Sequence, residues 1–274
     1  MTIPGLSLQG KVAAVTGSRR GIGKAIALAF AEAGADVAVC DYVVDGGELA
    51  AVAEEIQRLG RRSLAVQADV TKKADVDNLV QRVEGELGAI DILANNAGIS
   101  GIDLLSETPE EQWHKVIDVN LNGCFLCSRA VAERMIERKK GNIVSIASVE
   151  GMRGGVVRAL MPPSLVPNVP TAPAFMARPY NISKAGIIML TRVLARQLGS
   201  YGIRVNAIAP GAIKTDMIQI LWSNPEILKQ AELQIPLGRI AEPGEIASVA
   251  LFLASDASSY ITGHTILADG GLLA

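Results

Sequence analysis

The chain has 274 residues, of which 49% are apolar and 20% charged, and its formal net charge is −2. This length suffices for one large α/β domain, and with only 4% aromatic residues its core must be mainly aliphatic. The balanced charge gives no sign of a nucleic-acid surface, and no apolar run approaches the roughly 20 residues of a membrane span.

The N-terminus and the cysteines predict a cytoplasmic protein without a metal site. Residues 1–10 lack the charged and apolar regions of a signal peptide. Cys124 and Cys127 have the spacing of a redox or metal-binding pair, but the only other cysteine is Cys40 and there are two histidines. We therefore interpret the pair as small apolar residues on a buried helix.

A buried strand is predicted over residues 11–16, followed by a glycine turn and a helix over residues 24–33. Strand, glycine turn and helix together form the setting of a dinucleotide site. The glycines let the backbone approach a pyrophosphate, and the helix N-terminus offers unpaired N–H groups. A tight turn without a ligand is the alternative. The cofactor-binding residues predicted here are Gly17, Arg20, Gly21, Ile22 and Gly23.

The second strand, over residues 36–40, leads to Asp41, about 20 residues beyond the glycines. A carboxylate at this point accepts hydrogen bonds from the adenosine ribose and repels a 2′-phosphate, which favours NAD. Arg20 argues for NADP, because a guanidinium can bind a 2′-phosphate. We give Asp41 more weight and predict NAD, with NADP as the alternative.

Two further strands, over residues 63–67 and 91–94, alternate with helices over residues 48–59 and 71–87. Gly60 and Thr71 are the expected helix caps. Both strands end in short segments at the sheet edge where open α/β sheets bind ligands. The predicted cofactor contacts in these segments are Asp69, Val70, Asn96, Ala97 and Gly98.

Tyr180 and Lys184 are four residues apart and share one face if the segment is helical. A cation one turn away favours the phenolate and lowers the tyrosine pKa from its usual value of about 10. Such a pair can move a proton on or off an alcohol oxygen. Taken alone, a tyrosine and a lysine at this spacing are usually a surface pair without a function.

Four motifs in this order resemble the short-chain dehydrogenase/reductase family: T-G-x-x-x-G-I-G at 16–23, D-V at 69–70, N-N-A-G at 95–98 and Y-x-x-x-K at 180–184. The resemblance covers almost the whole chain. It implies a single NAD(P)-binding, Rossmann-type domain over residues 1–274, doubly wound, with helices on both faces of a mostly parallel sheet of about seven strands.

The resemblance also implies the catalytic residues. In a long helix over residues 113–138, Asn120 helps hold a proton-relay water, and a strand over residues 141–147 leads to Ser148, which binds the substrate oxygen. Tyr180 and Lys184, on a helix over residues 180–199, complete the tetrad. After a strand over residues 203–209, the nicotinamide would be held by the segment that contains Pro210, Gly211, Ile213 and Thr215.

The implied reaction is NAD-dependent oxidation of a small secondary alcohol. One alternative is an NADPH-dependent carbonyl reductase, including reduction of 3-oxoacyl thioesters. An alternative of another class is a non-catalytic dinucleotide sensor or scaffold. The resemblance further implies a homo-oligomer, a tetramer or dimer, formed through the two long helices and the C-terminal segment.

Between Ser148 and Tyr180 the chain departs from the family pattern by its length. Residues 151–179 hold six of the twelve prolines, no acidic residue, and three arginines, Arg153, Arg158 and Arg178. We predict a stiff, irregular loop over the substrate cleft and hypothesise that these arginines bind an anionic substrate group. A subunit contact or solvated arginines are the alternative.

A second lid is predicted over residues 215–239, before a helix over residues 245–253 and a last strand over residues 264–268. Its apolar side chains could enclose a substrate and exclude water. They are Met217, Ile218, Leu221 and Trp222.

Overall fold

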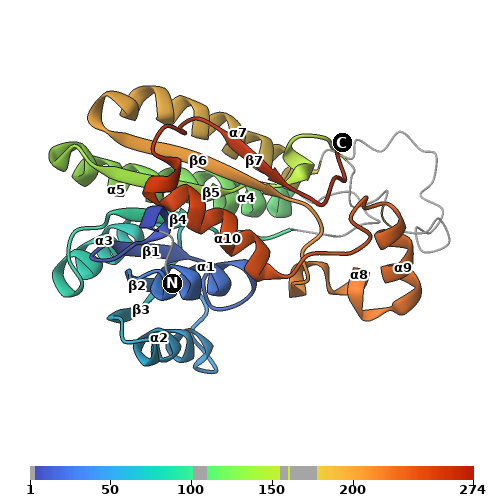
Figure 1. The fold of residues 1–274 in the computed structure, drawn as a ribbon, viewed down its shortest axis with the longest axis horizontal. Coiled ribbons are helices and arrows are strands. Elements are labelled where there is room, and N and C mark those ends of the chain that lie inside the picture. The colour runs from blue at the N-terminus through green and yellow to red at the C-terminus, as the bar shows by residue number, and fades with distance from the viewer. Residues whose placement is uncertain (1–3, 101–109, 155–159, 161–177) are drawn as a thin grey trace.

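Seven strands form the sheet in the part of the chain that the structure describes: β1 (Val12–Thr16), β2 (Asp36–Asp41), β3 (Ser63–Gln67), β4 (Ile92–Asn95), β5 (Gly141–Ile146), β6 (Ile203–Pro210) and β7 (Thr265–Ala268). A computed structural model describes residues 4–100, 110–154, 160 and 178–274. The strand order is β3-β2-β1-β4-β5-β6-β7, and all six pairings are parallel (Figure 1). The prediction of a single-domain, doubly wound parallel sheet is confirmed.

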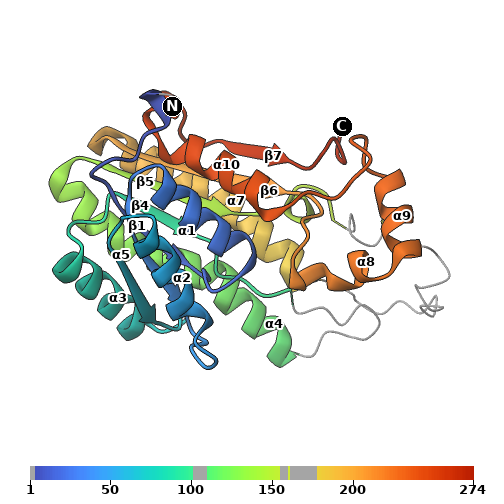
Figure 2. The ribbon, with the colours of Figure 1, turned by 60° about the horizontal axis from the view of Figure 1, so that its bottom comes forward.

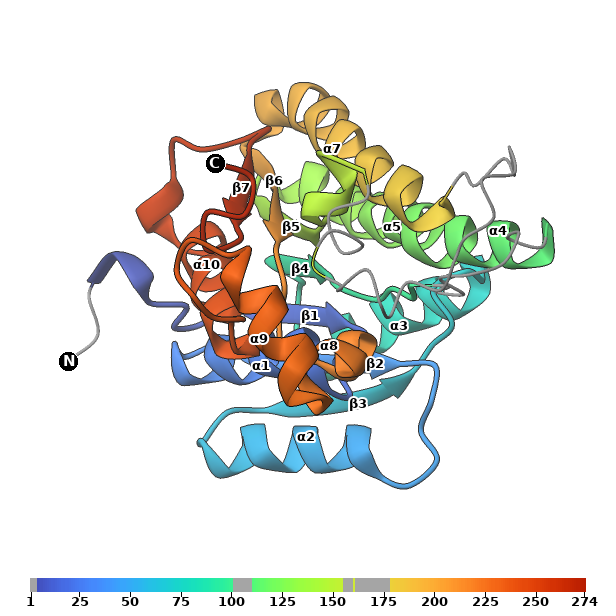
Figure 3. The same ribbon diagram turned by 90° about the vertical axis from the view of Figure 1, so that its right-hand side faces the viewer.

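Both faces of the sheet are covered by helices. In β1, Ala13 and Val15 belong to one apolar cluster, whereas Val12 and Ala14 belong to the other. A strand buried on both sides reads as a continuous apolar run, which explains the sequence pattern here. Figure 3 shows the two layers. One contains α1 (Gly21–Glu32), α2 (Glu48–Arg58) and α10 (Pro243–Ala254), and the other contains α3 (Lys73–Glu86), α5 (Gly123–Arg138) and α7 (Pro179–Leu198).

The long helix expected over residues 113–138 is interrupted. It begins earlier, as α4 (Glu110–Ile117), and passes through one π-helical segment, η2 (Asp118–Asn122), before α5. A π segment adds one residue to a turn, and such segments occur frequently at functional sites. Hydrophobic periodicity does not reveal this extra residue, but the segment is centred on Asn120, a residue predicted to be catalytic.

The carboxyl ends of the strands lie at one end of the molecule, beside α8 (Gln219–Ser223) and α9 (Pro225–Leu233) (Figures 1 and 2). Chain order reverses between β1 and β4, which makes this edge a topological switch point where such sheets bind ligands. Among the described helices, none is long and apolar enough to cross a membrane.

Candidate active site

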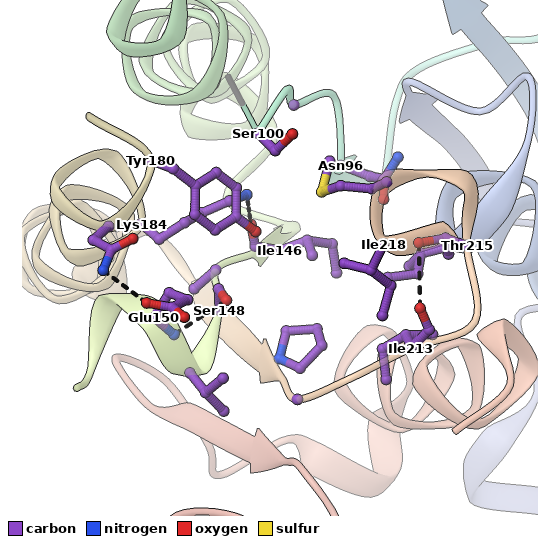
Figure 4. Close-up of a pocket in the computed structure, with 18 of the residues that line it drawn as sticks. Asn96, Ser100, Ile146, Ser148, Glu150, Tyr180, Lys184, Ile213, Thr215 and Ile218 are labelled. Carbon is purple, nitrogen blue, oxygen red and sulfur yellow. Dashed lines mark hydrogen bonds between the residues drawn. The ribbon is translucent and has the colours of Figure 1, made fainter. Parts of the chain in front are cut away.

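A cleft opens at the carboxyl ends of the central strands. Its wall is built by segments that follow β4, β5 and β6 and by the first turns of α1 and α7 (Figure 4). Ten residues predicted for the active site line it: Ile22, Asn96, Gly98, Ser148, Tyr180, Lys184, Pro210, Gly211, Ile213 and Thr215. Residues far apart in sequence therefore converge as the motif order predicted.

Ser148, Tyr180 and Lys184 meet on one side of this cleft. Ser148 directly precedes the 3-10 helix η3 (Val149–Gly151) and accepts a hydrogen bond from the Glu150 backbone N–H at 3.2 Å. Tyr180 lies in the first turn of α7, with Lys184 one turn further on. The Lys184 Nζ is buried, donates to the Ile146 carbonyl oxygen at 2.7 Å, and lies 5.6 Å from the centre of the Tyr180 ring.

The protonation of this pair differs from the sequence-based expectation. Burial, reinforced by the nearby Glu150 charge, raises the pKa of Tyr180 to about 12, although a hydrogen bond with Ser148 acts in the opposite direction. Burial also lowers the pKa of Lys184 to about 8. The expected lowering of the tyrosine pKa by the lysine is therefore not seen, because burial penalises the phenolate. At neutral pH the phenol keeps its proton.

Asn120 lies buried behind the cleft and ties three segments together. Its Oδ1 accepts from the Ile99 backbone N–H at 2.8 Å, and its Nδ2 donates to the Ile99 carbonyl at 2.9 Å and to Ser183 Oγ at 3.0 Å. A Cβ placed on Gly98 would lie 3.3 Å from Asn120 Oδ1 and 3.6 Å from Lys184 Nζ. The amide and the lysine therefore face the same point, although Asn120 does not line the main cleft.

The glycine turn is locked against the segment that follows β4. Asn96 Nδ2 donates to the carbonyl oxygens of Thr16 at 3.0 Å and Gly17 at 2.8 Å, and Thr16 Oγ1 accepts from the backbone N–H groups of Asn96 and Ala97. Gly17 has a φ of 62°, and a Cβ on Gly23 would lie 2.2 Å from the Gly17 oxygen. These glycines are thus required by packing as well as by any ligand.

The start of α1 fits a dinucleotide phosphate. The helix begins at Gly21, and no described side chain caps its first turn, which leaves its N–H groups open to an anion. A Cβ on Gly21 would lie 3.4 Å from Thr215 Cγ2, so the turn and the segment after β6 face each other closely. Backbone donors and small residues thus line the place where the motif predicts the pyrophosphate.

Arginines and acids meet at the end of β2, where the adenosine ribose is expected. The sequence analysis did not single out Arg19. Its Nε lies 4.0 Å from Asp41 Oδ1, and its guanidinium also forms an ion pair with Glu48. Arg20 is instead turned toward Asp216, with 2.5 Å between Nη1 and Oδ2. Two adjacent arginines in the glycine turn were visible in the sequence, but only the fold decides which of them approaches Asp41.

Asp69 and Val70 occupy the turn after β3. Asp69 Oδ1 accepts from the Thr71 backbone N–H at 3.0 Å and from Thr71 Oγ1 at 2.7 Å, while Val70 is buried against Gly123. Thr71 therefore does not cap α3 as expected. The N-cap is Lys72, because the threonine hydroxyl is used by the aspartate.

The structure describes the second predicted lid, residues 215–239, but only a small part of the first, residues 151–179. Of the second lid, Met217 and Ile218 line the cleft, whereas Leu221 packs into a separate apolar cluster and Trp222 donates to the Thr215 carbonyl at 2.9 Å. Most of residues 151–179, including Arg158, lie outside the described residues. Arg178 lines the cleft, and Arg153 is exposed.

Three polar cleft residues were not predicted, namely Ser100, Glu150 and Asn181. Glu150 and Asn181 lie within two residues of a predicted catalytic residue, and Ser100 lies two residues after Gly98. That adjacency was the only signal available.

The cysteines are free and buried, and burial raises the thiol pKa of all three. High thiol pKa values disfavour both the nucleophilic thiolate and metal binding. Within the described ranges, no group of three or more His, Cys, Asp or Glu side chains could hold a metal ion.

Two family models match the chain. One, described as short chain dehydrogenase, matches residues 11–160, and another, described as enoyl-(acyl carrier protein) reductase, matches residues 172–273. A 3-oxoacyl-(acyl-carrier-protein) reductase, FabG, of Staphylococcus epidermidis is 40% identical over 262 residues, covering 96% of this chain and 98% of the relative.

Solved structures share both the fold and part of the sequence. A short-chain type dehydrogenase/reductase from Mycobacterium marinum is 36% identical with a TM-score of 0.84, over 98% of both chains. A 7α-hydroxysteroid dehydrogenase complexed with NADH and 7-oxo glycochenodeoxycholic acid is 34% identical with a TM-score of 0.84, over 99% of this chain and 97% of the other.

Proposed function

This chain belongs to the short-chain dehydrogenase/reductase family and is an oxidoreductase, and we propose that it reduces a ketone to a secondary alcohol with a nicotinamide dinucleotide. The observation that carries the proposal is the meeting of Ser148, Tyr180 and Lys184 in the main cleft, with Tyr180 kept protonated. A neutral phenol is the form that can donate a proton to the oxygen of a ketone as it is reduced.

In the proposed reaction each residue has one task. The hydroxyl groups of Ser148 and Tyr180 hold the substrate oxygen, and Tyr180 donates its proton as negative charge develops there. Lys184, largely protonated at neutral pH, favours the phenolate that is left behind. Asn120 fixes the Gly98–Ile99 segment beside the lysine. The bound dinucleotide supplies the hydride.

One observation favours reduction over the alcohol oxidation that the sequence analysis placed first. The 40% identical relative from Staphylococcus epidermidis is named a 3-oxoacyl reductase. 3-Oxoacyl thioesters and esters are therefore the first substrates to test. NAD-dependent oxidation of an alcohol remains the second candidate, supported by the Asp41 carboxylate at the end of β2.

Cofactor preference is part of the proposal. Asp41 supports NADH, because a carboxylate beside the ribose repels a 2′-phosphate. The two guanidinium groups that could favour NADPH are both engaged in ion pairs, Arg19 with Glu48 and Arg20 with Asp216. We expect NADH to bind about tenfold more tightly than NADPH, and Asp41→Ala to narrow that ratio. Fluorescence titration of both cofactors measures it, and failure of both to bind would contradict the proposal.

The catalytic test is Tyr180→Phe, which removes the proposed proton donor and keeps the ring. Reduction of ethyl acetoacetate or an acetoacetyl thioester should fall about 100-fold or more in kcat, with unchanged cofactor binding. Tyr201→Phe, at an exposed tyrosine beyond the end of α7, is the matched control and should retain full activity. Undiminished turnover by Tyr180→Phe would show that the mechanism is wrong.

A further inference from the structure

An arginine in the glycine turn is shared unequally between two carboxylates. Arg19 forms an ion pair with Glu48, the first residue of α2, and its Nε lies 4.0 Å from Oδ1 of Asp41, the last residue of β2. Because hydrogen bonds of this kind span about 2.7–3.2 Å, only Glu48 of the two acids accepts one from the guanidinium. The cation is therefore drawn toward α2 and away from the carboxylate expected at the adenosine ribose.

This arrangement leaves one N–H group of Arg19 without a partner. Its Nε is buried and has no hydrogen-bond acceptor among the described residues. The Arg19 side chain as a whole is 15% exposed. A buried donor without an acceptor costs free energy, so the guanidinium gains by turning to a further acceptor when one is offered. Such an orphaned donor at the end of β2 fits a site that receives a polar group of a ligand.

Acidic side chains outnumber basic ones around this arginine. A hydrogen bond to Glu48 raises the pKa of the Arg19 guanidinium, although burial acts in the opposite direction. The charges of Asp41 and Asp216 add to the rise. Arg20 is the second cation here, and it pairs with Asp216. Three carboxylates against two guanidinium groups leave one net negative charge, which repels a 2′-phosphate.

Glu48 is suited to a role in this balance because the fold does not depend on it. Its side chain is 54% exposed and stands in the first turn of α2. Exposed ion pairs contribute little to stability. The hydrogen bond from Arg19 to Glu48 nevertheless occupies a guanidinium, the group whose planar fork of N–H donors matches a phosphate. Loss of Glu48 should therefore release Arg19 without unfolding the protein.

We propose that Glu48 is a positioning residue for cofactor selection, which holds the Arg19 guanidinium away from a 2′-phosphate and so excludes NADPH. This inference rests on the dinucleotide binding of the proposed function and extends it to a residue that acts through another. Asp41 opposes the phosphate directly by its charge, whereas Glu48 withholds the cation that would bind it. Without Glu48, the guanidinium forms a charge-assisted pair with the phosphate.

The test measures the dissociation constants of NADPH and NADH by fluorescence titration of the wild type and Glu48→Gln. We expect the variant to bind NADPH about tenfold more tightly, because the released guanidinium pairs with the 2′-phosphate. NADH lacks this phosphate, so its dissociation constant should change by less than about twofold. The matched control is Glu54→Gln, which removes the same charge from an exposed acid of α2 that pairs with Arg58. It should leave the ratio of the two constants unchanged.

A double variant shows whether Glu48 acts through Arg19. In the Arg19→Gln background, Glu48→Gln should tighten NADPH binding by no more than about twofold, because only the repelling charge is then removed. An equal gain with and without Arg19 would show that Glu48 is merely a nearby charge, and the inference would be overturned.

Two further results would also overturn the inference. One is a Glu48→Gln variant whose ratio of the two constants is unchanged or shifted toward NADH. The other is a wild-type protein that binds NADPH at least as tightly as NADH. Failure of the wild type to bind either cofactor would instead overturn the proposed function.

Discussion

Half-buried Tyr180 and buried Lys184 show how one environment acts on two groups of opposite charge type. Burial opposes the charged form of each, raising the phenol pKa to about 12 and lowering the ammonium pKa to about 8. Sequence spacing placed the residues on one helix face, where the structure puts them. The spacing did not indicate burial, which decides the direction of the tyrosine shift.

The lowered pKa of Lys184 predicts a stability change with pH. Its folded pKa of about 8 lies below the unfolded value of 10.5, so the unfolded chain binds more protons between these values. The free energy of unfolding should therefore increase as pH is raised from about 8 to 10.5. The same gain is lost when pH is lowered back to about 8. Relative to Lys184→Met, we expect wild-type stability to increase by about 2 kcal/mol between pH 7 and 9.5.

Urea unfolding of both proteins at several pH values gives their unfolding free energies. Subtracting the Lys184→Met value from the wild-type value at each pH removes the contribution of the other titrating groups. Parallel stability curves would show that Lys184 has an ordinary pKa in the folded protein.

At the scale of elements, the turn between β1 and α1 is held by close backbone contact with the segment after β4. The glycine pattern predicted this turn as a phosphate cradle. The structure adds that Gly23 packs against the Gly17 oxygen and Asn96 Nδ2. The two motifs therefore form one unit, and a change in either affects the other.

Gly23→Ala and Gly85→Ala form a matched pair that tests this contact. A Cβ at Gly23 would lie 2.2 Å from the Gly17 oxygen and 2.4 Å from Asn96 Nδ2. We expect a loss of about 2 kcal/mol in unfolding free energy and at least tenfold weaker dinucleotide binding. Gly85, exposed within α3, has no atom within 4 Å of its Cβ position, so alanine there should stabilise by about 0.5–1 kcal/mol. A stable Gly23→Ala protein with normal cofactor binding would contradict the packing argument.

At the scale of the whole molecule, α5 and α7 present apolar side chains to solvent on the face away from the sheet. Ile182, Met189 and Val193 of α7 are 45%, 55% and 42% exposed, and their spacing of seven and four residues places them on one helix face. Phe125 of the adjacent α5 is 40% exposed. This surface supports the predicted contact between copies of the chain through the two long helices.

The double variant Met189→Lys/Val193→Lys should dissociate the oligomer, because it places two charges in an apolar contact. Light scattering after size exclusion measures the mass. Leu59→Lys, at an exposed leucine beyond the end of α2 on the opposite layer, should leave the assembly intact. A monomeric wild-type protein would show the oligomer prediction to be wrong.

The individual strands, the glycine turn and the order of the polar motifs could be predicted from the residues, while the parallel sheet of about seven strands was implied by the family resemblance. The residue-level predictions follow from local periodicity, from glycines where the backbone requires them, and from the rule that parallel strands end together. The surroundings of the side chains depend on the tertiary structure. The fold placed Arg19 rather than Arg20 beside Asp41, inserted a π turn at Asn120, set Tyr180 half-buried in the cleft wall and brought Glu150 into the cleft. Each of these outcomes depends on contacts between segments distant in the chain, and a linear pattern contains no information on desolvation.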